Sequence, residues 1–130
     1  MSTASYKTFL KQIENGTKQT DAIRIYKFID VNNRCLISPN KDSICRGLDM
    51  KHQTATARLS DLMDLGVVEI SGHSSDEHKD LSFFKTQTDP FKIENNIHNR
   101  SKDKFHKWVN KGKEFGLSKD YMLATIRENF

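Results

Sequence analysis

Residues 47–69, GLDMKHQTATARLSDLMDLGVVE, constrain the fold more than any other stretch of the chain. The apolar residues in its middle recur at helical spacing, at Ala55, Leu59, Leu62 and Met63. Gly66 stands where a left-handed residue would end such a helix. Val67, Val68 and Ile70 then have the β-branched bias of a strand. The stretch therefore predicts an amphipathic helix at about 52–65, stopped by glycine and followed by a strand.

The opposite face of this helix is polar or small. It carries Gln53, Ala57, Ser60, Asp61 and Asp64, with Thr54, Thr56 and Arg58 on its flanks. Short side chains allow a helix to approach the DNA major groove closely, and Gln and Arg can present paired donors to base edges. Taken alone, the helix is more simply an ordinary surface helix, so its neighbours must decide between the two interpretations.

The neighbouring segments follow the order of a winged helix. Ser38, Pro39 and Asn40 suit a helix start, and a short helix is expected from about Asn40 to Leu48. The link Asp49–His52 has about the length of a helix-turn-helix turn. Downstream, Val67–Ser71 and Leu81–Thr86 are strand-like, and the polar run Gly72–Asp80 between them is expected to be a hairpin loop.

Residues 21–86 resemble a winged helix-turn-helix domain of the broad prokaryotic and phage type, similar to MarR-like regulators. In such families the run G-L-x-x-x-T-[VA]-[ST]-R-x-L-x-x-L-x-x-x-G-[LV]-[IV] marks the recognition helix. Here Gly47-Leu48 opens the run, Thr54-Ala55-Thr56 matches its middle, and the end is matched by Leu59, Leu62, Gly66, Val67 and Val68. The turn is about two residues longer than in the pattern, and the wing holds Asp76, Glu77 and Asp80 against Lys79.

The resemblance implies a mainly α fold with a small β-hairpin, a winged helix-turn-helix with flanking N- and C-terminal helices. It also implies sequence-specific binding of double-stranded DNA in the regulation of transcription or replication. Phosphate contacts would come from Lys51, His52, Thr54 and Thr56, base contacts from Gln53 and Arg58, and a wing contact from Lys79. Some winged helices dock on proteins instead, so the alternative is an adaptor that binds a host or polymerase protein and not DNA.

Helices are also expected on the N-terminal side of this unit. Tyr6, Phe9, Leu10 and Ile13 predict a helix that ends at Gly16. A second helix is expected from Asp21 to about Val31 with Thr20 as its N-cap, followed by a short Cys35–Ile37 strand that pairs with the hairpin. The expected domains are an N-terminal helix in residues 1–19, the winged helix in 20–88, and a basic linker with a C-terminal helical extension in 89–130.

The C-terminal extension changes in pattern along its length. Residues 91–100 are polar and rich in asparagine, which predicts a linker. A helix is expected from Ser101 to Gly116, and a last helix capped by Ser118 would bury Tyr121, Met122 and Ile126. Isolated helices this short are marginal in water, so they pack within the chain or pair with a second copy. Their aromatic content favours a homodimer through the N- and C-terminal helices.

Charge is uneven along the chain. Of the formal net charge of +4, residues 89–130 hold nine Lys and Arg against six acids. The segment Lys92–Lys113 interleaves basic residues with Phe91, Phe105 and Trp108, so it could contact phosphates. The simpler interpretation is a solvated helix face whose aromatic side chains pack inward.

Other classes of function find no support in the sequence. No apolar run approaches the roughly 18 residues of a membrane span, and no signal sequence is apparent, so Cys35 and Cys45 are expected to be free thiols in the cytoplasm. A zinc site from Cys35, Cys45, His73 and His78 would lack the close ligand pairs of such sites. Without a phosphate loop or a nucleophile–base arrangement, we expect no enzyme, cofactor, metal or small-molecule ligand. The size suits a phage or bacterial regulator.

Overall fold

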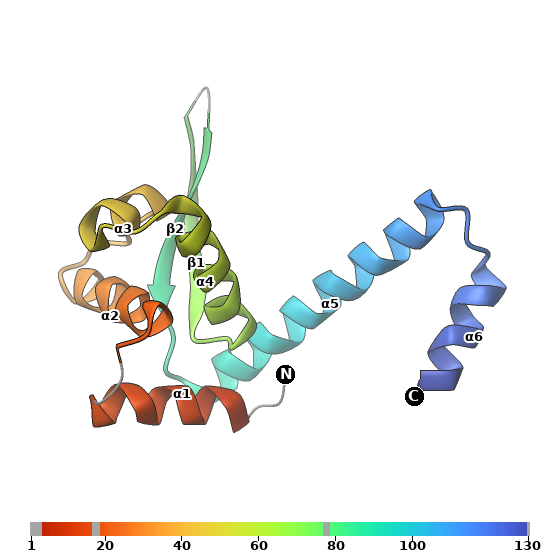
Figure 1. The fold of residues 1–130 in the computed structure, drawn as a ribbon, viewed down its shortest axis with the longest axis horizontal. Coiled ribbons are helices and arrows are strands. Elements are labelled where there is room, and N and C mark those ends of the chain that lie inside the picture. The colour runs from red at the N-terminus through yellow and green to blue at the C-terminus, as the bar shows by residue number, and fades with distance from the viewer. Residues whose placement is uncertain (1–3, 17–18, 77–78, 130) are drawn as a thin grey trace. The chain divides into compact units, whose positions relative to one another are not determined.

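The computed structural model describes residues 4–16, 19–76 and 79–129, with side chains described for all of these except 4–5, 74–76 and 79–80. The chain divides into two compact units, residues 1–97 and 98–130. In chain order the elements are α1 (Ala4–Asn15), α2 (Asp21–Arg34), α3 (Lys41–Leu48), α4 (His52–Asp64), β1 (Val68–Asp76), β2 (Lys79–Thr86), α5 (Pro90–Glu114) and α6 (Lys119–Asn129). The described chain is thus mainly helical with one antiparallel hairpin (Figure 1), as the sequence predicted.

Helices α3 and α4 form the expected helix-turn-helix. The Asn40 side chain caps α3 by accepting a hydrogen bond of 2.8 Å from the backbone N–H of Ser43, so Pro39 precedes the cap and does not lie in the first turn. Asp49, in the left-handed region with φ 49°, ends α3, and α4 starts three residues later. Arg24 of α2 donates a hydrogen bond of 2.9 Å to the carbonyl oxygen of Leu48, which fastens the end of α3 to α2. The helix predicted at about 52–65 is confirmed as α4, which ends at Asp64.

The core of the first unit joins all of its helices to the base of the hairpin. Its largest fully buried side chains are Ile23, Ile25, Ile29, Ile44, Leu62, Val67, Val68 and Ile93. Helix α1 contributes Tyr6 and Phe9, and the ring of Phe9 meets that of Tyr26 edge to face at 5.5 Å. The apolar face of the N-terminal helix is therefore buried within its own chain. Thr20 caps α2 as predicted, accepting from the N–H of Ile23 at 3.2 Å.

The hairpin is longer than the sequence suggested. Strand pairing runs from Val68↔Thr86 to Asp76↔Lys79, with one irregularity between Ile70 and Gly72. The expected loop at Gly72–Asp80 is therefore wrong, since Gly72–Asp76 and Lys79–Asp80 are strand; residues 77–78 of this run lie outside the described residues. Backbone pairing needs no apolar side chains, so strands without the alternating apolar pattern gave no strand signal. Figure 1 shows the hairpin projecting past α3 and α4.

The expected Cys35–Ile37 strand is also wrong. Cys35 and Leu36 lie in a turn, and Leu36 has a φ of 61°, a conformation that cannot continue a strand. Pairing with the hairpin comes later, as a bridge between Asn40 and Phe83 and a hydrogen bond of 2.9 Å from the N–H of Phe84 to the carbonyl oxygen of Pro39. The third strand of the wing is reduced to this bridge.

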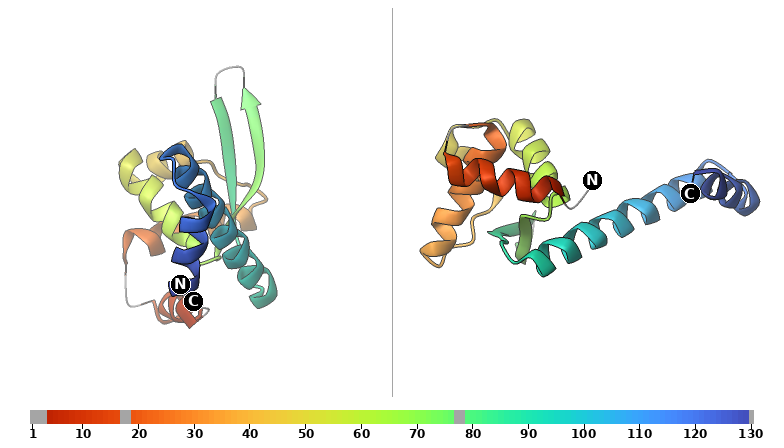
Figure 2. Two further views of the ribbon diagram at one scale, coloured as in Figure 1. Left: turned by 90° about the vertical axis from the view of Figure 1, so that its right-hand side faces the viewer. Right: turned by 90° about the horizontal axis from the view of Figure 1, so that it is seen from below.

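The expected linker at residues 91–100 is wrong, because those residues are helical. Helix α5 starts at Pro90, and the Asp89 carboxylate caps it by accepting a hydrogen bond of 3.0 Å from the N–H of Phe91. Helix α5 is 25 residues long and is unbroken in Figure 2, although a break before Ser101 was expected. Its second turn places Ile93, which is 0% exposed, in the core of the first unit.

The second unit is a hairpin of two helices, the rest of α5 and α6. Ser118 caps α6 as predicted, accepting from the N–H of Tyr121 at 3.1 Å. Met122 is buried against Gly112, where a Cβ atom would come within 2.7 Å of the Met122 methyl carbon. The expected burial of Tyr121 is wrong, since its side chain is 60% exposed, and Ile126 is half-buried. Among the described residues, no helix is both long enough and apolar enough to cross a membrane.

Candidate nucleic-acid interface

The two faces of α4 differ as the sequence predicted. Ala55, Leu59 and Leu62 are buried, at 0%, 3% and 0% exposure. Five of the candidate DNA-contacting residues of this motif are exposed and Thr54 is half-buried; the exposed ones are Lys51, His52, Gln53, Thr56 and Arg58. The core thus fixes the rotation of α4, with Gln53 opposite the buried residues and with Thr56 and Arg58 on the two flanks.

The N-terminal end of α4 is suited to an anion. Lys51 occupies the N-cap position with extended backbone and makes no capping hydrogen bond with its side chain. The first N–H groups of a helix point outward and carry partial positive charge, which attracts phosphate. His52 Nε2 lies 3.4 Å from the Asp42 carboxylate of α3, so this histidine also links the two helices of the motif.

Arg58 is held by a neighbour one turn along the same helix. Its Nε atom lies 3.1 Å from the Asp61 carboxylate, and the two side chains are 44% and 55% exposed. An exposed pair of this kind contributes at most about 1 kcal/mol, so Arg58 can exchange it for another acceptor. Asp61 shares the exposed face, so this face carries both signs of charge.

The wing lies beside the N-terminal end of α4. A hollow of about 460 Å³ is lined in part by Asp42, His52, Ser82 and Phe84, which come from α3, α4 and β2. On the wing itself, the Ser82 hydroxyl and His73 Nδ1 lie 3.3 Å apart across the two strands. Lys79 is paired with Asp76 through the backbone, and its side chain lies outside the described ones, as do residues 77–78 altogether. The wing contact by Lys79 remains a prediction.

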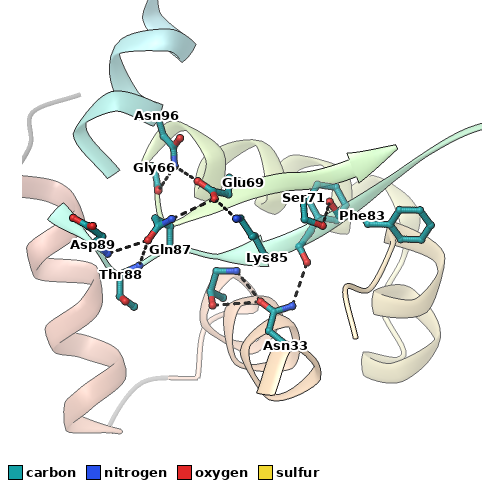
Figure 3. Close-up of polar contacts among 12 residues, drawn as sticks. Asn33, Gly66, Glu69, Ser71, Phe83, Lys85, Gln87, Thr88, Asp89 and Asn96 are labelled. Atoms are coloured by element: carbon teal, nitrogen blue, oxygen red, sulfur yellow. Dashed lines mark hydrogen bonds and ion pairs between the residues drawn. The ribbon is translucent and has the colours of Figure 1, made fainter. Parts of the chain in front are cut away.

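Asn33, at the end of α2, holds the wing in place, and sequence reasoning missed it. Its side-chain oxygen accepts a hydrogen bond of 2.9 Å from the N–H of Thr86, and its amide donates to the carbonyl oxygens of Ile37 and Phe84 at 3.0 and 3.3 Å. Figure 3 shows this amide between α2 and the hairpin. Asn33 and Thr86 are 53 residues apart, so no local spacing rule could pair them.

A second polar cluster ties the hairpin to α5 (Figure 3). The Glu69 carboxylate accepts from Asn96 at 2.7 Å and from Gln87 at 3.2 Å, and Lys85 Nζ lies 3.0 Å from it. Asn96 also donates to the carbonyl oxygen of Gly66 at 3.1 Å. Burial alone would raise the pKa of Glu69, but these hydrogen bonds and the charge of Lys85 together lower that pKa below its ordinary value.

Replacing Glu69 by Gln should destabilise the protein by roughly 1–2 kcal/mol at neutral pH, because charge-assisted hydrogen bonds are lost. A lowered folded-state pKa means that the ionised carboxylate stabilises the fold above the unfolded pKa, and that this stabilisation is lost as the pH falls through the folded pKa. The difference in unfolding free energy between wild type and Glu69→Gln should therefore shrink between roughly pH 5 and pH 3. Urea titrations at several pH values measure it, and a difference independent of pH would contradict the network.

The two cysteines differ in their exposure to solvent. Cys35 is exposed and Cys45 is buried, and both are free thiols. Within the described part of the chain, no group of three or more His, Cys, Asp or Glu side chains is arranged to hold a metal ion. His78, the fourth ligand of the zinc site weighed above, lies outside the described residues.

A helix-turn-helix, with α4 as its second helix, and an adjacent two-stranded wing are thus present in the first unit. The fold is a winged helix-turn-helix. No family model matches the sequence, and no curated protein matches it.

The solved structures that are similar to this chain include two described by the proteins they contain. One is a possible transcriptional regulator from Methanosarcina mazei Go1, with a TM-score of 0.48 and 15% sequence identity over 83% of this chain and 86% of that one. The other is Staphylococcus aureus MarR in complex with salicylate and kanamycin, with a TM-score of 0.43 and 16% identity over 95% of this chain and 79% of that one.

Proposed function

We propose that the protein binds double-stranded DNA through the exposed face of α4 and thereby regulates transcription or replication. The observation that carries this proposal is the rotation of α4. Leu59 and Leu62 are buried in the core, Gln53 is exposed on the opposite side, and Arg58 is exposed on a flank. A helix held rigidly in this way can enter the major groove without first ordering itself, which lowers the entropic cost of binding.

The side chains along α4 suit different parts of the duplex. Lys51, His52, Thr54 and Thr56 would bind phosphates near the start of the helix, where its partial positive charge adds to theirs. Gln53 and Arg58 are the two residues able to form bidentate hydrogen bonds with base edges. Arg58 would leave Asp61 on binding, at the small cost of an exposed ion pair.

Replacing Arg58 by Ala should weaken binding to the specific site by roughly 1–3 kcal/mol if Arg58 contacts a guanine, and should relax selectivity at that base. Replacing Lys51 by Ala should lower specific and non-specific binding about equally and reduce the salt slope by about one. Lys51 makes no capping bond with its side chain, so the fold should tolerate this change. Gel-shift titrations against genomic fragments at two salt concentrations measure both effects.

Asp61→Asn provides the matched control for Arg58→Ala. It releases the arginine from its ion pair and removes a negative charge from the exposed face, so it should strengthen DNA binding. If neither Arg58→Ala nor Lys51→Ala changes DNA retention, the adaptor function replaces this proposal. Asp61, which lies on the same face, would suit a protein partner as well. Cleavage of the DNA in the presence of a divalent metal would instead indicate a nuclease.

We further propose that the chain is a homodimer through its C-terminal helices. Helix α1 keeps Tyr6 and Phe9 in the core of its own chain, with Leu10 and Ile13 packed against that core. The second unit instead leaves large side chains exposed, namely Phe105, Trp108, Phe115, Leu117 and Tyr121. A two-fold dimer of 15.0 kDa chains should scatter light as a species near 30 kDa. A species of one chain's mass at micromolar concentration would contradict the dimer.

A further inference from the structure

The positive net charge of the protein comes from its second unit. Residues 1–97 hold 13 Lys and Arg and 13 Asp and Glu, whereas residues 98–130 hold eight and four. The helix-turn-helix is neutral too, because Lys41–Asp64 contains four basic and four acidic residues. The first unit therefore carries base-reading residue types on α4 without an excess of positive charge.

A first unit without net charge would lack the electrostatic attraction to DNA that a DNA-binding protein needs. Neutralisation of phosphates by Lys and Arg, with release of counterions, supplies most of the non-specific affinity of a DNA-binding protein. The same attraction speeds the encounter with DNA. If the winged helix binds duplex DNA, the attraction must come from another part of the chain.

Helix α5 carries a row of cations at helical spacing. Arg100, Lys104, Lys107 and Lys111 are separated by four, three and four residues. At 100° per residue they fall within about 60° of the helix circumference, and at 1.5 Å per residue they extend over about 16 Å. We call these four residues the basic strip. Its length corresponds to the rise of roughly five base pairs.

The basic strip lies away from the side of α5 that packs against α6. The side of α5 that meets α6 carries Val109 and Gly112, with Met122 buried against Gly112. On a helical projection that side lies roughly 120° from the strip. Lys104, Lys107 and Lys111 are exposed, and Arg100 is half-buried. Within the described part of the chain, no ion pair within 4.0 Å is recorded for Lys107 or Lys111.

We propose that the basic strip binds the phosphate backbone of duplex DNA and supplies the sequence-independent attraction that the first unit lacks. This inference rests on the proposed function of α4, because the same duplex is the ligand of both. A row of four cations without an apolar side chain between them along the strip fits a regular line of phosphates better than a membrane surface, which also requires apolar insertion. Sequence recognition would then belong to the first unit and electrostatic attraction to the second.

The test compares two double substitutions in the full chain. Lys107→Gln with Lys111→Gln removes two charges from the strip. Lys7→Gln with Lys11→Gln removes two charges at the same spacing from exposed positions of α1. Glutamine has nearly the helix propensity of lysine, so both proteins should keep the wild-type melting temperature. The measurement is the slope of log K against log salt concentration for a labelled random-sequence duplex.

The strip variant should lose about 1.8 units of slope, since each phosphate contact contributes about 0.9, and the α1 variant should keep the wild-type slope.

Equal slopes for the three proteins would contradict phosphate binding by the basic strip, whatever the role of α4. A lost slope in the strip variant, together with unchanged site preference in Arg58→Ala, would overturn the role of α4 and leave the strip. Absence of any duplex binding by the wild type would overturn both. Tighter binding to phosphatidylserine vesicles than to duplex, abolished by the strip variant, would overturn DNA as its ligand.

Discussion

Replacing Leu59 by Ala is expected to lower the free energy of unfolding by about 2–5 kcal/mol. Leu59 is 3% exposed and belongs to the core that joins α1, α2, α4 and the hairpin. Truncation removes its buried methyl groups and leaves a cavity that the surrounding core can only partly fill. Urea unfolding followed by circular dichroism measures the change.

Gln53→Ala is the matched control for Leu59→Ala, because Gln53 is an exposed residue of the same helix. Its cost should stay within about 0.5 kcal/mol. Comparable losses for the two variants would mean that α4 is rotated, and that the candidate DNA-contacting side chains do not share one exposed face. Ser60, which the sequence placed on the exposed face, is half-buried, so it is a less suitable control.

Gly66→Ala is the second substitution with a large expected effect. Gly66 has a φ of +80°, and a Cβ atom there would come within 2.6 Å of the Ile93 carbonyl oxygen. The left-handed conformation costs a non-glycine residue about 1–2 kcal/mol, and the overpacking adds about 1–3 kcal/mol. The melting temperature and the urea midpoint should both fall well below those of the wild type.

Gly16→Ala separates the two contributions at Gly66. Gly16 has a φ of +66°, and among the described residues no atom outside its chain neighbours lies within 4 Å of where its Cβ atom would be. It should therefore show the conformational cost alone, about 1–2 kcal/mol. If Gly66→Ala costs no more than Gly16→Ala, the close approach between the end of α4 and the start of α5 is not present in solution.

The sequence predicted those parts of the fold in which one face is buried and the other exposed. The apolar spacing of α4 gave both its bounds and its buried side, because burial selects residues at the helical period. Thr20 and Ser118 were recognisable as caps because capping is a local interaction. Elements without one buried face and one exposed face were not predicted. The outer half of the hairpin is polar, and most of α5 beyond Ile93 and Ile97 is exposed.

The supports of the candidate site could not be predicted, for a different reason. Asn33 binds Thr86, and Asn96 binds Glu69 and Gly66, across separations of 27 to 53 residues. Asparagine is common in turns and linkers, which is how residues 91–100 were interpreted. Its role here becomes visible only when the fold brings its amide to unsatisfied carbonyl and carboxylate oxygens. The wing contact by Lys79 is still a sequence prediction.

The core of this winged helix extends beyond β2 into α5. A segment that ends after β2 therefore cannot be transferred to another protein as a complete folding unit. Ile93 and Asn96 lie beyond Thr86, yet one fills the core and the other satisfies the carbonyl oxygen of Gly66. A chimaera joined at residue 88 would have a cavity in place of Ile93. It would also leave the Gly66 carbonyl oxygen and one oxygen of the Glu69 carboxylate without their hydrogen bonds from Asn96. A chimaera joined after Ile97 would contain the whole first unit. Recombination that exchanges such winged helices is therefore expected to preserve the first two turns of this helix with the winged helix, and to vary the sequence that follows them.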